Sequence, residues 1–246
     1  MPAASADRPV QIPPPPSGPA PVIAISSSRT AIRLIVLRGA VAEGTAYDLK
    51  EGLQAMGRQG DLAFPGDALM ASRHVVFQRI GDAADVAEVP GPTGCFRRIR
   101  QPEVIESGAV IFAGEQYLLV RRGDDVPAET VDGDNLPPEV FGTPLPAPHL
   151  HITQLLLGGL PGRVVSTDRD VLTVGREGCD LSFPQDRFLS GRHLRCEMLS
   201  DGTIQIVDVG SLNGTFVRCE NLPYRIEKGD ELLVGQMLFR ADIREE

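Results

Sequence analysis

Residues 208–217 read Asp208-Val-Gly-Ser-Leu-Asn213-Gly214-Thr215-Phe-Val. An apolar run at 204–207 precedes it, and apolar residues follow Thr215. An Asn-Gly pair between two such runs is typical of a tight turn between antiparallel strands. Taken alone, such a pair is usually just a hairpin turn, and it predicts no function.

Short β-branched or aliphatic runs recur along the rest of the chain. Gly, Pro, Asp or Asn interrupts them about every 8–12 residues, and no stretch shows a helical period over three turns. This pattern predicts an all-β fold of antiparallel sandwiches or barrels. The clearest runs are residues 33–37, 47–49, 75–77, 117–120, 155–157, 171–174, 204–207 and 231–234.

Prolines and acidic residues divide the chain into blocks. Residues 1–30 hold eight prolines, which predicts a disordered or polyproline tail. Residues 123–150 hold six prolines and six acidic residues without Lys or Arg, which predicts a semi-extended linker. Two all-β blocks remain, 31–122 and 151–246, and we expect each to form one sandwich.

The two blocks repeat one another with a period near 119 residues. Gly57-Arg58, Asp61-Leu-Ala-Phe-Pro65 and Arg73-His74 in the first block match Gly175-Arg176, Asp180-Leu-Ser-Phe-Pro184 and Arg192-His193 in the second. Ile105-Glu-Ser-Gly108 likewise matches Ile226-Glu-Lys-Gly229. Such self-similarity indicates an internal duplication.

Three short motifs of the second block occur together at a fixed spacing. Arg176 lies 14 residues before Ser190, and His193 lies 20 residues before Asn213. Gly-Arg, Ser-x-x-His and Gly-Ser-x-Asn-Gly-Thr in this order resemble the forkhead-associated (FHA) domain over about residues 152–243. The resemblance implies a sandwich of two antiparallel sheets that binds phosphothreonine peptides through the loops at one end.

The resemblance also implies roles for the loop residues. A phosphate with charge near −2 favours a guanidinium fork with hydroxyl and backbone donors, which Arg176, Ser190 and Gly191 would supply. Asn213 would hold the peptide backbone, and we expect His193 to be mainly architectural. The remaining expected contributors are Arg192 at the rim, Ser211 and Leu212 around the threonine methyl, and Gly175, Asp208, Gly210, Gly214 and Thr215 as supports.

The first block resembles a degenerate second copy of the same domain. Arg58 and His74 are retained, but Ala71 aligns with Ser190, and Ser72 aligns with Gly191. The Asn-bearing loop is shortened to Gly91-Pro-Thr-Gly-Cys-Phe. The first block is therefore expected to act as a scaffold, and Arg58, Ser72 and His74 mark its residual counterpart of the site.

Composition and motifs exclude several classes of protein. The formal charge is −9, which disfavours general nucleic-acid binding. No apolar run approaches the ~20 residues of a spanning helix, and no signal peptide is evident, so we expect a cytoplasmic protein without membrane insertion. The four cysteines form no C-x-x-C pair and are expected to be free thiols.

No catalytic or cofactor site is expected either. Ser190 and His193 lie in one loop without a nucleophile elbow, which does not favour a hydrolase. His149 and His151 form the only close histidine pair, and they lack matching Cys or carboxylate ligands for a metal.

Two kinds of binding protein remain. The first is a phosphothreonine-dependent adaptor whose partners are substrates of a Ser/Thr kinase. The second is an assembly module in which both sandwiches make phosphate-independent contacts. Thr130 lies in an acidic stretch of the linker, and once phosphorylated it is a candidate intramolecular ligand for the second block.

Overall fold

The chain folds almost entirely into β-strands. The structure is a computed structural model that describes residues 30–89, 94–125, 149–219 and 223–245. Within these ranges it contains twenty strands and two short 3-10 helices, Gly123–Asp125 and Leu157–Gly159. None of the described helices is long and apolar enough to cross a membrane. The predictions for residues 1–29 and for most of the linker, Thr130 included, lie outside the described residues.

The first sandwich consists of two facing sheets. The five-stranded sheet has the order β4-β3-β5-β6-β18, and half of a ten-stranded sheet, β2-β1-β20-β19-β7, faces it. Ile32, Leu34 and Val36 alternate along β1 and are fully buried in a core shared with both sheets, as expected for a strand with one apolar face. The strands are β1 (Thr30–Arg38), β2 (Ala46–Asp48), β3 (Gly52–Gly57), β4 (Leu62–Ala63), β5 (Val75–Ile80), β6 (Ala83–Glu88), β7 (Cys95–Arg98), β18 (Tyr224–Arg225), β19 (Glu231–Val234) and β20 (Met237–Glu245).

The second sandwich has the same plan. Its five-stranded sheet has the order β14-β13-β15-β16-β8, and the other half of the ten-stranded sheet, β12-β11-β10-β9-β17, faces it. Leu118 and Val120 of β10 pack in one core with Leu172 and Val174 of β13. The strands are β8 (Glu103–Ile105), β9 (Val110–Ala113), β10 (Gln116–Arg122), β11 (Leu150–Leu155), β12 (Pro161–Thr167), β13 (Val171–Gly175), β14 (Leu181–Ser182), β15 (Leu194–Met198), β16 (Ile204–Asp208) and β17 (Thr215–Arg218).

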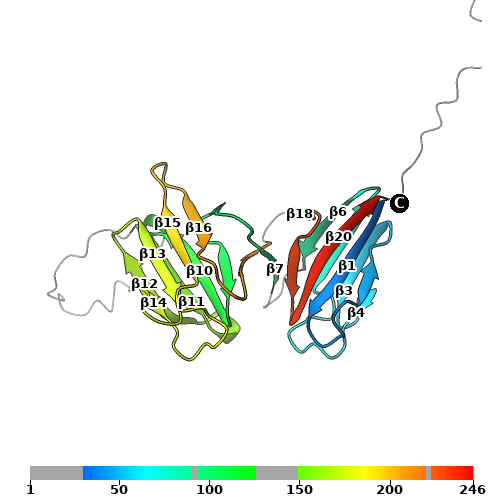
Figure 1. The fold of residues 1–246 in the computed structure, drawn as a ribbon, viewed down its shortest axis with the longest axis horizontal. Helices are drawn as coiled ribbons and strands as arrows, with labels where there is room; N and C mark the ends of the chain where they lie inside the picture. Colours follow the sequence, from blue (N-terminus) through cyan, green and yellow to red (C-terminus); the bar gives the residue numbers. More distant parts are fainter. Residues whose placement is uncertain (1–29, 90–93, 126–148, 220–222, 246) are drawn as a thin grey trace, which may run out of the picture.

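The two sandwiches exchange their last three strands. Strands β18–β20, late in the sequence, complete the first sandwich, and β8–β10, from the first half, complete the second. Figure 1 shows this by colour: the red strand β20 lies beside the blue strand β1, and the green strand β10 lies in the lobe of the yellow strands. The structure thus departs from the expected contiguous sandwiches at 31–122 and 151–246. Hydrophobic alternation specifies which face of a strand is buried, but not which of two similar copies supplies its partner.

Strands β7 and β17 join the two halves of the ten-stranded sheet. They pair antiparallel, with Arg97 opposite Val217, and the Cys219 N–H donates to the Cys95 carbonyl over 2.7 Å. Cys95 and Cys219 are both buried, and all four cysteines carry free thiols. The contact with the Cys219 thiol, together with burial, raises the pKa of Cys95 well above its ordinary value. The crossover is therefore a closely packed, unreactive part of the sheet.

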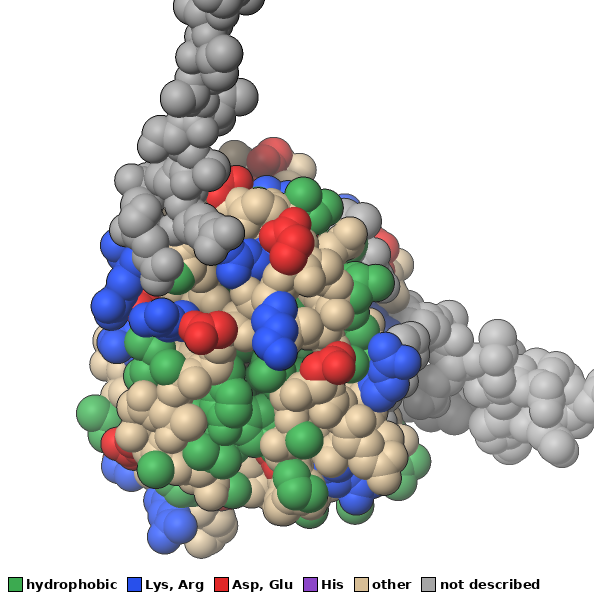
Figure 2. Space-filling model, turned by 90° about the vertical axis from the view of Figure 1, so that its right-hand side faces the viewer, with side chains coloured by type: hydrophobic (Ala, Val, Ile, Leu, Met, Phe, Trp, Pro, Cys, Tyr) green, Lys and Arg blue, Asp and Glu red, His purple; other side chains and the backbone are tan. Residues whose placement is uncertain are grey.

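The outer end of the first sandwich carries charges of both signs. In Figure 2, Lys and Arg side chains lie beside Asp and Glu side chains, and hydrophobic side chains gather in the lower half of the view. A nucleic-acid-binding surface requires clustered positive charge. The mixture seen on this face does not provide it.

Candidate functional site

Three loops of the second sandwich bring the predicted phosphate-binding residues together. Arg176 follows β13, Ser190 lies between β14 and β15, and Leu212 lies between β16 and β17. The Arg176 N–H donates to the Ser190 carbonyl over 2.8 Å, and the Leu212 N–H donates to Ser190 Oγ over 3.1 Å. The hydroxyl proton of Ser190 remains available to a ligand, because its oxygen serves here as the acceptor.

The Arg176 guanidinium has capacity for a ligand. Its side chain is 43% exposed and lies 4.0 Å from the Glu177 carboxylate, which is itself 76% exposed. An exposed ion pair at that distance contributes little. Within the described parts of the chain, the guanidinium has no closer ion pair. It can therefore turn to a phosphate at small cost.

His193 holds two of the loops from beneath. It is fully buried; its Nδ1 accepts from the Ser190 N–H over 3.2 Å, and its Nε2 lies 3.0 Å from the Gly214 carbonyl. Burial lowers the pKa of His193, which favours the neutral ring with the proton on Nε2. Both ring nitrogens are thus occupied by the backbone, which argues against contact with phosphate and against a role as base toward Ser190 Oγ.

Asp208 organises the loop that carries Asn213. Its carboxylate accepts from the N–H groups of Gly210 and Ser211 over 2.9 and 2.7 Å, and from the hydroxyls of Ser211 and Thr215 over 2.6 and 2.7 Å. Burial alone would raise the pKa of Asp208, but these hydrogen bonds outweigh it and the pKa is lowered. The ionised carboxylate therefore fixes the loop. Ser211 was expected near the threonine methyl, but its hydroxyl donates to Asp208 instead.

Asn213 links two loops of the site. Its Nδ2 donates to the Phe188 carbonyl over 2.8 Å, and the Arg187 guanidinium lies 4.9 Å from the Phe188 ring centre. Leu212, beside Asn213, is 86% exposed, so its side chain points to solvent. The motifs did not identify Phe188.

Two glycines of the site are required by geometry. A Cβ at Gly175 would collide with the Gly191 carbonyl oxygen, so the loops approach closely only because residue 175 has none. Gly214 has φ of 86°, and a Cβ there would collide with the Arg98 guanidinium. Of the other expected residues, Gly210 also has positive φ, and Arg192 is exposed.

Residues from the first half of the chain support these loops. Asp186 accepts from the Phe188 N–H over 2.9 Å, from the Glu115 N–H over 2.8 Å and from Gln116 Nε2 over 2.7 Å. Arg98, which covers Gly214, forms an ion pair with Glu231 at 2.9 Å. Glu115 and Gln116 reach the site with the exchanged strands β9 and β10, and Arg98 reaches it through the pairing of β7 with β17. None of the three could be assigned to the site from the motifs.

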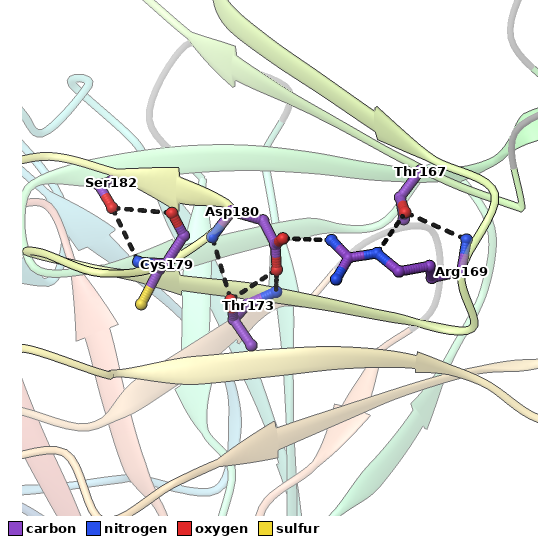
Figure 3. Close-up of polar contacts among 6 residues, drawn as sticks. All are labelled: Thr167, Arg169, Thr173, Cys179, Asp180 and Ser182. Carbon is purple, nitrogen blue, oxygen red and sulfur yellow. Dashed lines mark hydrogen bonds and ion pairs between the residues drawn. The ribbon is translucent and has the colours of Figure 1, made fainter. Parts of the chain in front are cut away.

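A second network stiffens the turn after Arg176. Asp180 accepts from the Thr173 N–H over 2.9 Å and from the Thr173 hydroxyl over 2.6 Å, and it pairs with Arg169 (Figure 3). Ser182 Oγ donates to the Cys179 carbonyl over 3.0 Å and accepts from its N–H over 3.1 Å. Burial opposes ionisation of Asp180, but its bonds to Thr173 and Arg169 lower its pKa. The turn between β13 and β14 is thus tied at both ends.

The first sandwich repeats the braces without the same donors. The N–H groups of Arg58 and Gln59 donate to the carbonyls of Ala71 and Ser72, each over 2.9 Å. His74 accepts from the Ala71 N–H over 3.0 Å, and its Nε2 lies 2.8 Å from the Gly94 carbonyl. Ala71 therefore occupies the place of Ser190 and offers no hydroxyl. The shortened loop at 90–93 lies outside the described residues.

His149 and His151, at the start of β11, contact polar side chains nearby. His149 Nδ1 lies 2.9 Å from Asp170, and His151 contacts the hydroxyls of Ser166 and Thr153 at 2.7 and 3.0 Å. Among the residues that the structure describes, no group of three His, Cys, Asp or Glu side chains is placed to hold a metal ion.

Part of the second sandwich is similar to known proteins. Residues 172–235 match the FHA domain model. Over 70 residues the chain is 39% identical to a protein of Corynebacterium diphtheriae named "Oxoglutarate dehydrogenase inhibitor". The matched region makes up 28% of this chain and 48% of the relative, so the chain spans about half of the relative's length. A solved structure described as "Structural and functional analysis of phosphothreonine-dependent FHA domain interactions" is 24% identical, with a TM-score of 0.23, over 37% of this chain and 95% of its own. The chain contains an FHA domain at residues 172–235.

Proposed function

We propose that this protein is an adaptor that binds phosphothreonine peptides of Ser/Thr kinase substrates through its FHA domain. The observation that carries the proposal is the convergence of Arg176, Ser190 and Asn213 on one end of the second sandwich. The Arg176 guanidinium supplies a planar fork for two phosphate oxygens, and the Ser190 hydroxyl and Gly191 N–H supply further donors. Asn213 holds the backbone of the peptide beside its phosphothreonine.

The first sandwich takes a different role in this proposal. It is a degenerate copy of the FHA domain, since Arg58 and His74 keep their positions while Ala71 replaces the serine hydroxyl. A phosphate docked there would have fewer donors. We assign the first sandwich to support of the second through the exchanged strands rather than to phosphopeptide binding.

The experiment is a titration of a degenerate phosphothreonine peptide library and its unphosphorylated twin against the whole protein, Arg176→Ala and Arg58→Ala. Charge-assisted hydrogen bonds contribute about 1.5–3 kcal/mol, so Arg176→Ala should lose roughly 10- to 150-fold in affinity. Arg58→Ala is the matched control and should bind as wild type. Equal binding of both libraries, with the fold intact, would instead favour the phosphate-independent assembly module.

Thr130 is proposed as one ligand of this site within the same chain. It lies in the acidic linker outside the described residues. A tethered phosphothreonine has a high effective concentration and would compete with external peptides. The test is to phosphorylate Thr130 and measure the affinity for a peptide from the library; an unchanged affinity and hydrodynamic radius would remove Thr130 from the account.

A further inference from the structure

A groove of about 460 Å³ lies between the two sandwiches, beside the phosphopeptide site. The second sandwich lines it with Phe188, Asn213 and Gly214 from the site loops, and the first sandwich lines it with Leu69 and Gln236. Leu69 and Phe188 stand at equivalent positions of the repeat, two residues after Asp67 and Asp186. Corresponding loops of the two sandwiches therefore line the groove from both sides.

The floor of the groove is apolar. Phe112, Phe216 and Leu233 line it together with Tyr117. The ring centre of Phe112 lies 4.9 Å from that of Tyr117 and 6.3 Å from that of Phe216. Their strand neighbours, such as Ile111 and Leu118, point into the sandwich core, so these strands are apolar on both faces. Phe216 and Leu233 are already buried in this cluster, whereas Phe112 and Tyr117 are only partly buried, so these two rings present the apolar surface of the groove to another apolar group.

The groove is continuous with the phosphopeptide site. Asn213 lines the groove, donates to the Phe188 carbonyl and follows Leu212, whose N–H bonds to Ser190 Oγ. A peptide held by Arg176 and Ser190 that passes Asn213 therefore meets the groove within a few residues. The charged residues among the described lining are Arg38 and Glu115, which have opposite signs, so the groove as a whole favours a neutral side chain.

We infer that the phosphothreonine ligand places a large apolar side chain, such as Leu or Phe, in this groove. The inference rests on the proposed function. It makes the first sandwich a contributor to sequence preference through Leu69 and Gln236, although it lacks the phosphate-binding hydroxyl. Both sandwiches then contact the phosphopeptide, and not the second sandwich alone.

The test uses the full chain and phosphothreonine peptides in which each flanking position is fixed in turn as Leu, Phe, Ser or Asp. The best apolar peptide and its Ser twin are then titrated against Leu69→Asp and Gln236→Glu. Leu53→Asp is the matched control, because Leu53 is 69% exposed in β3 of the same sandwich and does not line the groove. Circular dichroism and urea unfolding check that each variant folds.

We expect Leu or Phe to be preferred at one flanking position. Burial of such a side chain in an open groove predicts a loss of about 5- to 30-fold in Leu69→Asp for the apolar peptide, with little change for its Ser twin. Gln236→Glu should weaken the apolar peptide in the same selective way, and Leu53→Asp should change nothing. Binding that needs phosphate and Arg176 but is indifferent to the Leu69 and Gln236 variants would overturn the groove and keep the proposed function. Binding that needs neither phosphate nor Arg176 would overturn both.

Discussion

The two sandwiches share their braces and differ in the residues that face a ligand. His193 joins the Ser190 N–H to the Gly214 carbonyl, and His74 joins the Ala71 N–H to the Gly94 carbonyl in the same way. Asp186 and Asp67 each hold a turn from the other half of the chain, through the N–H groups of Glu115 and Gln236 at 2.8 and 2.7 Å. At the position where the second sandwich has Ser190, the first has Ala71. The shared histidines and aspartates therefore stabilise the loops of both sandwiches, whereas the hydroxyl proposed to bind phosphate is present only in the second.

The strand exchange makes each sandwich dependent on both halves of the chain, and removing one half has the largest expected effect. Residues 149–246 alone lack β8–β10, so the core around Leu172 and Val174 loses Ile111, Leu118 and Val120. Loss of several buried aliphatic contacts exceeds the stability of a typical domain. We expect this half to be aggregated or unfolded by circular dichroism and size-exclusion chromatography, and residues 30–125 to rescue it when the two are co-expressed. A folded monomer of 149–246 that binds phosphopeptide would show that β18–β20 can close on their own sandwich.

The buried histidines should be equally important for stability and unequal for binding. Loss of either ring leaves a part-buried N–H and a buried carbonyl without the histidine as partner, so His193→Ala and His74→Ala should each reduce the free energy of unfolding by about 2–4 kcal/mol. Urea unfolding measures this change. Phosphopeptide affinity at a temperature where both variants are folded should fall only in His193→Ala. An equal loss of affinity in His74→Ala would place a ligand site on the first sandwich.

The serine hydroxyl gives a smaller and sharper contrast. Ser190→Ala removes one donor to the phosphate and should weaken the phosphopeptide by roughly 10-fold, as measured by isothermal titration calorimetry. The reciprocal change, Ala71→Ser, restores only one donor and should not create a second binding event. A second event in Ala71→Ser would mean that the first sandwich had lost its function through that single residue.

The smallest expected effect is a dependence of stability on pH through His193. Burial lowers the pKa of His193 in the folded protein, whereas the unfolded imidazole titrates near ~6.5. As the pH falls below ~6.5, the unfolded chain binds a proton that the folded chain does not, so the free energy of unfolding decreases, until the folded pKa is passed. Urea unfolding at two pH values on either side of ~6.5 should show a lower free energy of unfolding at the more acidic value, part of it from this residue. The decrease should be smaller in His193→Gln; an unchanged pH dependence in that variant would assign it to other groups.

Sequence reasoning reached the loops of the site because the motif residues lie at fixed distances from strands with clear alternation. The burial of Ile32, Leu34 and Val36 follows directly from that alternation. The contributions of Glu115 and Gln116 were missed, because they depend on which half of the chain supplies the last three strands, and that of Arg98 was missed because it depends on the pairing of β7 with β17. Strands β8–β10 and β18–β20 present similar apolar faces, so the hydrophobic pattern does not indicate which of the two sets completes which sandwich. Asp186 had a usable signal, since Asp67 and Asp186 both follow the repeated Phe-Pro by two residues.

The stoichiometry of binding shows most directly whether one or both of the sandwiches bind a phosphothreonine peptide. Calorimetry of the whole chain with a phosphothreonine peptide enriched from the library should give one peptide per chain. That binding should be lost in Arg176→Ala and retained in Arg58→Ala. Two peptides per chain, or loss of binding in Arg58→Ala alone, would contradict the assignment of reading to the second sandwich and of support to the first.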